Sequence, residues 1–412
     1  MSIWNDPIKE RKIIRMRVNI EVQHICEKQQ NLRGIPYYIL NLVKSLVVRN
    51  NNNYSISFFD QNKERNNRKF IDEYIEDEVR QNISIHECNS LSFKTIIDSC
   101  INGNSLLYNN RSYNDYIGIN ADVFHFPHIQ FVPRNVNGRI VVTAHDIMPL
   151  LPGFQTFWGD KSRASFKNSI HYVEQREDII IIADSLSTKN DILTYSEISQ
   201  ERIHVVPLAY DTKIHYPEKN EEVLTSMQIS SPYLLYLGML DFRKGIVDIL
   251  EAFEALKPRY SDLKLVLAGA LKPSVESIHR KLSNCRYRAD VILPGYVNDE
   301  QKRALLSSAT VFLFPSEYEG FGLPVLEAMA CGCPVITTNV SSLPEVGGNA
   351  AIYVSPKNPE QLGHEIDRLL VSESLRQEYI VKGIEHSGKF SWDKTAQMTE
   401  EVYKLSMKVG RA

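Results

Sequence analysis

The sequence lacks the features that mark membrane-spanning, secreted and nucleic-acid-binding proteins. No apolar run approaches the roughly 20 residues of a transmembrane helix, and the N-terminus has no signal-peptide core. The 47 lysines and arginines are balanced by 50 aspartates and glutamates, which gives a formal net charge of −3. This charge balance therefore gives no reason to expect a nucleic-acid partner, because binding to a phosphate backbone needs a clustered positive field. We expect a cytoplasmic protein.

Cysteine is scarce as well. The chain has six cysteines, and only Cys331 and Cys333 lie close together. A single Cys-x-Cys lacks the second pair of ligands that a structural zinc site requires. We expect reduced, mostly buried thiols and no bound metal.

The stretch "IKERKIIRMR" at 8–17 mixes basic and apolar residues. A solvated lead-in to the first strand is the simpler interpretation. A peripheral contact with anionic lipid at the inner face of the membrane is the alternative.

The order of apolar segments predicts an α/β fold. The chain has 412 residues, more than one typical hydrophobic core accommodates. Short apolar runs alternate with amphipathic stretches, the pattern of parallel βα units. The polar, aperiodic stretch 210–230 interrupts this alternation, which then restarts with "YLLYLGML". We therefore predict two Rossmann-like, doubly wound domains, residues 1–212 and 213–390, that face each other across a cleft.

The stretch "SEYEGFGLPVLEAMACGCPV" at 316–335 follows a predicted strand. Glu319 lies in the predicted loop and Glu327 about one turn into the following helix, with seven residues between them. A loop and helix start of this kind expose N–H groups that suit anionic or oxygen-rich ligands. A glutamate near a helix N-terminus is also favourable without a ligand, so an incidental pair is the alternative.

Three further strand ends carry candidate residues. Arg243 and Lys244 follow the first strand of the second domain, where two cations suit a diphosphate or form an ordinary charged turn. His145 ends a first-domain strand and could bind substrate or move a proton. His125 and His128 lack a third ligand at metal-binding spacing. Gly34, in the first strand-to-helix loop, allows a tight turn or a close approach to a ligand phosphate.

These segments together resemble a known family. "EYEGFGLPVLEAMACGCPVITTN" and "LPEVGGNAAIYVSP" look like the donor-site signature of the retaining glycosyltransferases of family four, which have the GT-B fold. "RIHVVPLAYD", "YLGMLDFRKG" and the terminal "FSWDKTA" match in the family's order, and "RGIPYYILNLV" and "VVTAHDIMPL" resemble its first-domain motifs. The resemblance is strong over 200–395 and nearly absent over 60–115. It implies acceptor binding by residues 1–212, donor binding by 213–390, and a helix at 391–412 that packs back on the first domain.

The resemblance also implies a role for each matching residue. Glu327 would hold the ribose hydroxyls of a nucleotide-diphosphate sugar. Glu319 would hold the donor sugar with the backbone around Phe321, Gly322 and Leu323. Arg243 and Lys244, with Lys302 in support, would bind the diphosphate and stabilise the departing charge. The backbone at Tyr296 and Val297 would receive the base, Gly34 would approach the phosphates, and His145 would face the transferred sugar.

Two residues depart from the family pattern. Met239 stands where many members have an arginine, so phosphate binding falls more heavily on Arg243 and Lys244. Pro36 stands where a second glycine is frequent, which leaves Gly34 as the permissive residue of that loop. Neither departure removes the Glu319 and Glu327 pair.

The implied reaction transfers a mannose-like hexose, with retention, to a glycan or lipid-linked saccharide in bacterial polysaccharide synthesis. The chain contains no Asp-x-Asp, consistent with a metal-independent site without a cofactor. Retention in this family is described as same-face attack, so Glu319 is not expected to be a covalent nucleophile. A catalytically silent partner subunit and a GT-B nucleotide-sugar epimerase are the alternatives. A dinucleotide-dependent dehydrogenase would need a Gly-x-Gly-x-x-Gly turn after a strand, which is missing.

Overall fold

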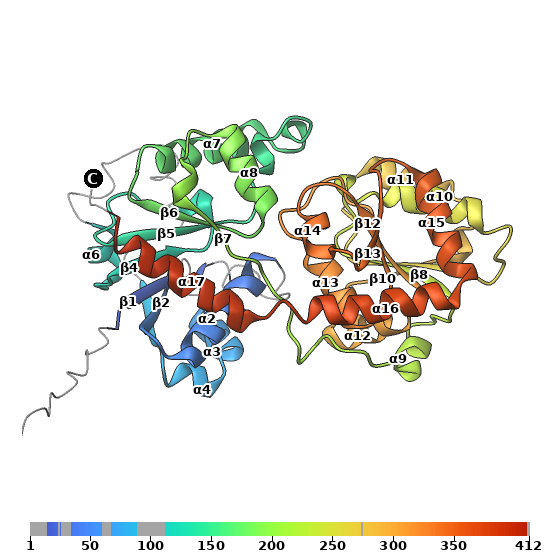
Figure 1. Cartoon of the computed structure of the whole chain (residues 1–412), viewed down its shortest axis with the longest axis horizontal. Helices are drawn as coiled ribbons and strands as arrows, with labels where there is room; N and C mark the ends of the chain where they lie inside the picture. The colour runs from blue at the N-terminus through green and yellow to red at the C-terminus, as the bar shows by residue number, and fades with distance from the viewer. Residues whose placement is uncertain are drawn as a thin grey trace, which may run out of the picture. The chain divides into compact units, whose positions relative to one another are not determined.

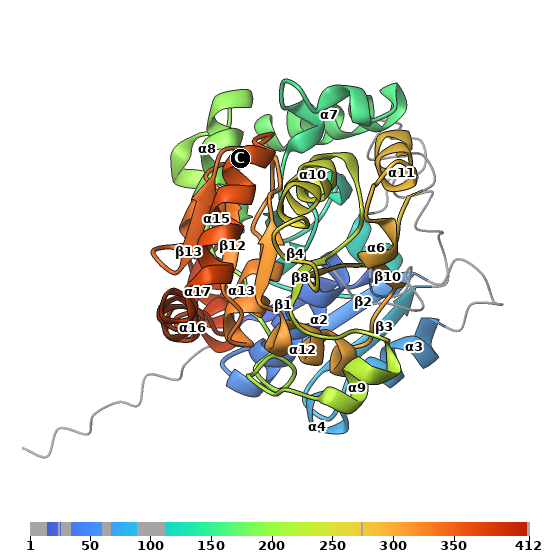
Figure 2. The ribbon, with the colours of Figure 1, turned by 90° about the vertical axis from the view of Figure 1, so that its right-hand side faces the viewer.

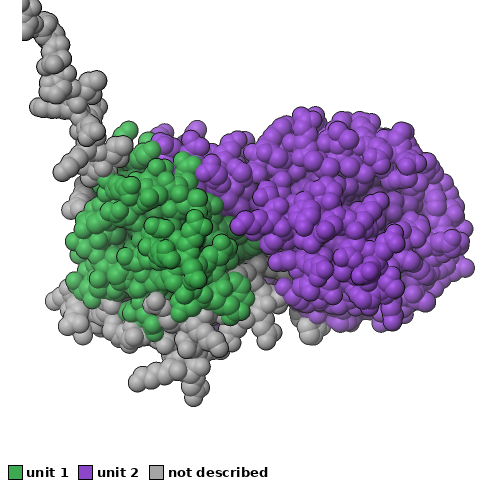
Figure 3. Space-filling model, turned by 90° about the horizontal axis from the view of Figure 1, so that it is seen from below, with its two compact units in different colours: residues 1–142, 403–412 green, residues 143–402 purple. Residues whose placement is uncertain are grey.

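The computed structural model describes residues 15–23, 25, 34–59, 67–88, 112–272 and 275–409. Most of the basic stretch at 8–17, and much of the segment 60–115, over which the family resemblance is nearly absent, lie outside these residues. The described chain forms two compact units, residues 1–142 with 403–412 and residues 143–402, which Figure 3 colours separately.

The first sheet has seven strands in the order β3-β2-β1-β4-β5-β6-β7. Its strands are β1 (Arg17–Glu21), β2 (Asn53–Phe59), β3 (Ser84–Cys88), β4 (Val123–Phe126), β5 (Arg139–Ala144), β6 (Ile179–Ala183) and β7 (Ile203–Val205). Neighbouring strands pair in parallel, with Val18 opposite both Tyr54 and Val123. All five residues of β6 are buried, which explains its unbroken apolar sequence.

The second sheet has six strands in the order β10-β9-β8-β11-β12-β13. They are β8 (Tyr233–Leu237), β9 (Lys264–Ala268), β10 (Val291–Gly295), β11 (Val311–Phe314), β12 (Val335–Thr338) and β13 (Ala351–Val354). The order reverses direction between β8 and β11, which pair in parallel. In open α/β sheets, such a switch point is where the loops at the carboxyl ends form a binding crevice.

Helices connect the parallel strands, as the alternating pattern predicts (Figure 1). The main ones are α2 (Ile35–Arg49), α7 (Asp160–Glu174), α8 (Leu186–Tyr195), α10 (Ile246–Leu256), α12 (Asp299–Ser308), α13 (Leu323–Ala330), α15 (Pro359–Val371) and α16 (Glu373–Ser387). Figure 2 turns the molecule so that the second sheet and its helices face the viewer. Helices α10 and α15 lie close together, since a Cβ on Gly363 would be 3.8 Å from Ala252.

The last described helix, α17 (Trp392–Ser406), returns to the strands of the first sheet. Thr395 Oγ1 donates to the carbonyl of Pro207, just beyond β7, at 2.7 Å. Near the other end of the helix, the Tyr403 hydroxyl lies 2.7 Å from Nδ1 of His125 on β4. The two Rossmann-like sheets and the returning helix confirm the predicted fold class.

The predicted domain boundary at 212/213 falls between β7 and β8. The stretch from 210 to 230 is the one that interrupts the alternation of the sequence and is the best candidate for a domain linker. It includes the short helix α9 (Glu221–Ser226), which begins at Asn220, whose side chain accepts the Val223 N–H. None of the described helices combines the length and the apolar character of a membrane span.

Candidate active site

The segment between β11 and β12 forms a loop and then a helix, as its sequence indicates. Gly322 adopts φ 112°, a left-handed conformation that favours glycine, and it precedes α13. Pro324 occupies the first turn, where its missing N–H costs no hydrogen bond. Glu319 therefore lies in the loop, and Glu327 follows on the helix with only 6% of its surface exposed.

Arg243, Lys244 and Glu319 form one group of charges, which we call the cation cluster. The two cations lie on a 3₁₀ turn, η6 (Phe242–Lys244), beyond the carboxyl end of β8. Arg243 Nη1 lies 3.1 Å from Glu319 Oε2, and Lys244 Nζ contacts the other oxygen, Oε1. Because β8 and β11 are neighbours in the sheet, the loops that follow them meet at one edge.

The ionisation of the cation cluster follows from burial and mutual attraction. Burial raises the pKa of Glu319, but Lys244 and Arg243 outweigh it and lower this pKa to about 2. Burial lowers the pKa of Lys244, against the opposing effect of Glu319. For Arg243, burial is outweighed by Glu319, and its pKa rises. Glu319 is therefore a carboxylate at neutral pH, and the cluster has an excess of positive charge.

Three serines fix the Glu319 loop, and the sequence analysis did not identify them. Ser316 Oγ donates to Glu319 Oε1 at 2.6 Å. Ser341 Oγ accepts the N–H of Glu319 at 3.0 Å, and Ser342 Oγ donates to the carbonyls of Glu319 and Phe321 at 2.9 and 2.6 Å. Ser341 and Ser342 follow β12, the next strand in the sheet. Their position beyond a strand end was the only signal in the sequence.

Lys302, Glu327 and His215 form a second group, which we call the Glu327 cluster. Lys302, on α12, brings Nζ to 2.6 Å from Glu327 Oε1. His215 brings Nε2 to 3.6 Å from the same oxygen. All three residues are buried. Lys302 was expected to support the diphosphate, and the structure pairs it with the carboxylate expected to hold the ribose.

Tyr296 and Val297 follow β10, at the carboxyl end of the second sheet. Gly295, the last residue of β10, adopts φ 73° and redirects the chain there. Tyr296 is 50% exposed and Val297 is buried. The backbone predicted to receive the base is therefore at the same edge of the sheet as the two clusters.

His145 lies beyond β5 and is bonded to an aspartate that the sequence analysis missed. Its Nδ1 is 2.5 Å from Oδ2 of Asp184, which follows β6 and is almost fully buried. Burial raises the pKa of Asp184, although His145 opposes the shift. The rule that identified His145, a polar residue at a strand's carboxyl end, would also have identified Asp184.

The backbone of His145 lies against Gly320, the residue after Glu319. A Cβ at position 320 would be 1.9 Å from the His145 carbonyl oxygen, so a side chain there has no room. Thr188 Oγ1 lies 3.3 Å from the carbonyl oxygen of His145 and 3.2 Å from that of Gly320. His145 therefore lies next to the Glu319 loop, within the unit formed by residues 143–402.

The remaining predicted residues lie in the other unit. Gly34 adopts φ 63° directly before α2, as a tight turn requires. Its predicted approach to the donor phosphates stays a prediction. His125 is bonded to Tyr403, and His128 Nδ1 accepts the Gln130 N–H at 3.0 Å, so both have local structural partners. Within the described ranges, no three His, Cys, Asp or Glu side chains are grouped as metal ligands.

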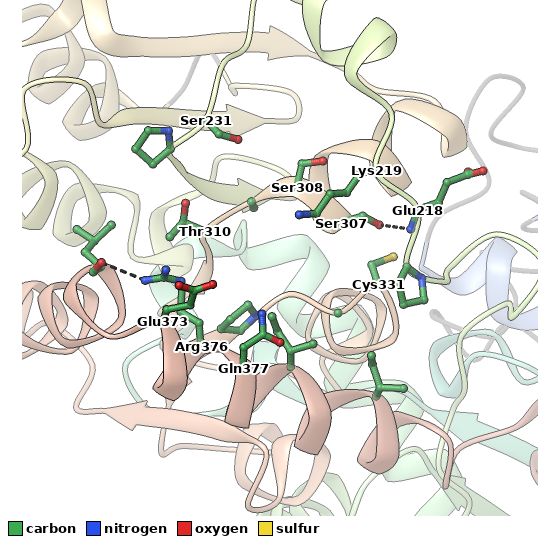
Figure 4. Close-up of a pocket in the computed structure, with 18 of the residues that line it drawn as sticks. Glu218, Lys219, Ser231, Ser307, Ser308, Thr310, Cys331, Glu373, Arg376 and Gln377 are labelled. Carbon is green, nitrogen blue, oxygen red and sulfur yellow. Dashed lines mark hydrogen bonds between the residues drawn. The ribbon is translucent and has the colours of Figure 1, made fainter.

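A surface groove of about 750 Å³ lies elsewhere on the second sheet (Figure 4). It is lined by Ser231, Pro232, Thr310 and Pro334, which precede β8, β11 and β12, and by residues of α16 such as Arg376. These are the amino ends of the strands. The groove is therefore at the opposite end of the sheet from both charged clusters.

Comparison with known proteins identifies the family. The sequence model described as "Glycosyl transferases group 1" matches residues 226–386. The O-antigen chain mannosyltransferase B of Escherichia coli is 30% identical over 305 residues, which cover 72% of this chain and 76% of the relative. The chain belongs to the glycosyl transferase group 1 family.

Other matches agree with this family assignment. The serotype-specific mannosyltransferase WbdA of Escherichia coli is 28% identical over 275 residues, or 65% of this glycosyltransferase and 33% of the relative. This chain therefore matches about a third of that longer relative. The solved structure of Anabaena Alr3699/HepE in complex with UDP and glucose has a TM-score of 0.69 at 14% identity, covering 94% of this chain and 99% of HepE. At that identity the likeness shows the fold, GT-B. The chain is a glycosyltransferase of family four, a retaining family.

Proposed function

We propose that this glycosyltransferase transfers mannose or a related hexose from a nucleotide-diphosphate sugar to a glycan or lipid-linked saccharide in polysaccharide synthesis. The cation cluster carries the proposal, because it places two half-buried cations beside the start of α13. The mannosyl specificity is supported by the names of the two Escherichia coli relatives. The nucleotide-sugar donor is supported by the UDP and glucose bound in HepE.

Arg243 and Lys244 would bind the diphosphate and stabilise the charge that develops as it leaves. Two positive charges face one carboxylate, so the cluster has a net charge of one positive unit. In the described part of the chain, Arg243 uses only Nη1, bonding Glu319 and the Tyr318 carbonyl, and Lys244 bonds only Glu319. The remaining N–H groups of both side chains are available to phosphate oxygens. A diphosphate is already a good leaving group, so the main requirement is to stabilise the negative charge that develops on it. Fixed donors of this kind supply that electrostatic stabilisation.

The remaining residues would position the donor. Glu319 would accept hydrogen bonds from sugar hydroxyls, and the backbone N–H groups of Phe321, Gly322 and Leu323 would donate hydrogen bonds to them. Glu327, held by Lys302, would bind the ribose, and the backbone at Tyr296 and Val297 would receive the base. His145, which lies against the Glu319 loop, would face the transferred sugar. No divalent ion is needed in this scheme, because Arg243 and Lys244 supply the positive charge.

A transfer assay tests the proposal. Purified protein is incubated with a panel of nucleotide-diphosphate sugars and lipid-linked saccharides, in buffer with a chelator, and nucleoside diphosphate release is measured. We expect acceptor-dependent release with a mannosyl donor, and a product whose anomeric NMR signals match the donor configuration. Release that requires a divalent ion would contradict the metal-independent scheme. A free sugar epimer as the only product would favour the epimerase alternative.

A further inference from the structure

His215 is a buried residue of the Glu327 cluster for which the proposed function has no role. It lies on the segment between β7 and α9 and has 3% of its surface exposed. Its Nδ1 is 3.1 Å from the carbonyl oxygen of Asp211. A carbonyl oxygen only accepts hydrogen bonds, so Nδ1 carries the proton in this contact.

The tautomer decides what Nε2 can do. A neutral imidazole protonated at Nδ1 has a lone pair at Nε2. This atom is buried and has no hydrogen-bond partner among the described residues. It faces Glu327 Oε1 at 3.6 Å, so two acceptors oppose each other. A second proton, placed on Nε2, would convert this contact into a charge-assisted hydrogen bond.

The charges around His215 come from two helices, α12 and α13. Glu327 of α13 and Asp299 of α12 favour the protonated ring, while Lys302 of α12 disfavours it. Arg303, also on α12, donates to the neighbouring Ile214 carbonyl at 3.4 Å.

Two further groups complete these surroundings. The Tyr210 ring meets His215 edge-on, with 6.3 Å between the ring centroids. Burial raises the pKa of Cys331, close to Glu327, to about 12, so this thiol stays neutral. Burial has a larger effect on the pKa of His215 than any of these charges, and it lowers this pKa. The ring is therefore neutral at neutral pH.

We propose that His215 is a positioning residue of the donor site, which makes no hydrogen bond to Glu327 when neutral and bonds its carboxylate when protonated. The proposal rests on the proposed function, in which Glu327 accepts hydrogen bonds from ribose hydroxyls. An imidazolium bonded to Oε1 would be a second charged donor on the oxygen that Lys302 already bonds, so the carboxylate would accept more weakly from the ribose hydroxyls. Donor affinity then falls on acidification by up to about tenfold per pH unit below the pKa of the ring.

The first test measures GDP and UDP binding by titration calorimetry from about pH 8 to about pH 5, the range in which histidine titrates. The wild type is compared with H215F, which fills the site with a ring that cannot titrate. The diphosphate itself takes up a proton near pH 6, about the second pKa of a phosphate group, and this effect is common to both proteins. We expect the affinity of the wild type to fall more steeply than that of H215F. Identical pH profiles would overturn the proposal.

The second test needs neither nucleotide nor a folded H215F variant. In protein labelled with ¹⁵N-histidine, the His215 ring signals, assigned with H215Q, should show the neutral tautomer protonated at Nδ1 at neutral pH. The E327Q variant should shift the ring's titration to lower pH, because the stabilising carboxylate is removed. A ring that is charged at neutral pH, or a titration unaffected by E327Q, would overturn the proposal. If the ring titrates as expected while neither nucleotide binds at any pH, the donor-site assignment of Glu327 fails and the coupling to His215 remains.

Discussion

The guanidinium Nη1 of Arg243 lies 3.1 Å from Oε2 of Glu319, and the other oxygen of this carboxylate contacts Lys244. One half-buried carboxylate thus faces two cations from the neighbouring loop. Its removal would leave two positive charges with too little compensation in a poorly hydrated site. The charge balance of the cation cluster therefore matters both for folding and for the proposed diphosphate binding.

The variant E319Q should be less stable than the wild type. Breaking a buried ion pair by removing one partner typically costs about 3–5 kcal/mol, and the cost here should be near the lower end because glutamine retains hydrogen bonds. Urea denaturation measures the change. The matched control is D290N, since Asp290 also contacts two lysines, Lys257 at 2.9 Å and Lys264, at the amino end of β10. D290N should lose stability while keeping full transfer activity, whereas E319Q should lose both.

The stabilising effect of Glu319 should disappear in acid. Its pKa is about 2 in the folded state against an ordinary value of 4.5. The contribution, about 3 kcal/mol, is therefore fully present above pH 4.5 and is lost as the pH falls towards 2. The difference in unfolding free energy between wild type and E319Q should shrink when urea denaturation is repeated at lower pH within this window. A constant difference would mean that Glu319 has an ordinary pKa.

The variant K244A should slow transfer more than it weakens donor binding. The charge of Lys244 matters most as the diphosphate departs. Removing one such stabilising group typically lowers kcat on the order of a hundredfold. Steady-state kinetics separate kcat from KM. The control variant is K357A. Lys357 is exposed, and its Nζ lies 2.9 Å from Glu317, which is in the same loop as Glu319. This variant should be fully active. Full turnover by K244A would refute the phosphate role of this lysine.

The variant E327Q should weaken nucleotide binding. Hydrogen bonds to charged groups contribute about 1.5–3 kcal/mol, so the dissociation constant should rise by about 10- to 100-fold. E254Q is the matched control, because Glu254 of α10 also pairs with a lysine, Lys281, at 2.7 Å. An equal loss in both variants would point to general destabilisation.

Much of the fold follows from local sequence patterns. The alternation of apolar and amphipathic stretches predicts both sheets, and Gly322 and Pro324 mark the start of α13. Strand β13 and helices α7 and α16 were not predicted. Helix α16 has little separation of polar and apolar faces and few buried residues, so its sequence has weak periodicity. Helix α9 has only six residues, which is too short for a period to be visible.

The candidate residues were predictable, but most of their contacts were not. Arg243, Lys244, Glu319 and Glu327 stand out because they follow strands or start helices. The pairing of Lys244 with Glu319 depends on β8 and β11 being neighbours, which is a property of the strand order. The contact of His215 with Glu327 joins residues more than a hundred positions apart, and nothing in the local sequence of either indicates it. Asp184 could have been identified by its position at the end of β6.

Titration of one nucleotide-diphosphate sugar against four proteins tests the central claim most directly. That claim is that the cation cluster and the Glu327 cluster hold the same donor. With the mannosyl donor of the transfer assay, calorimetry should show one site in wild type and D290N, with E327Q weakened most and K244A weakened less. Equal binding by all four proteins, or no binding to the wild type by any nucleotide-sugar, would contradict the account.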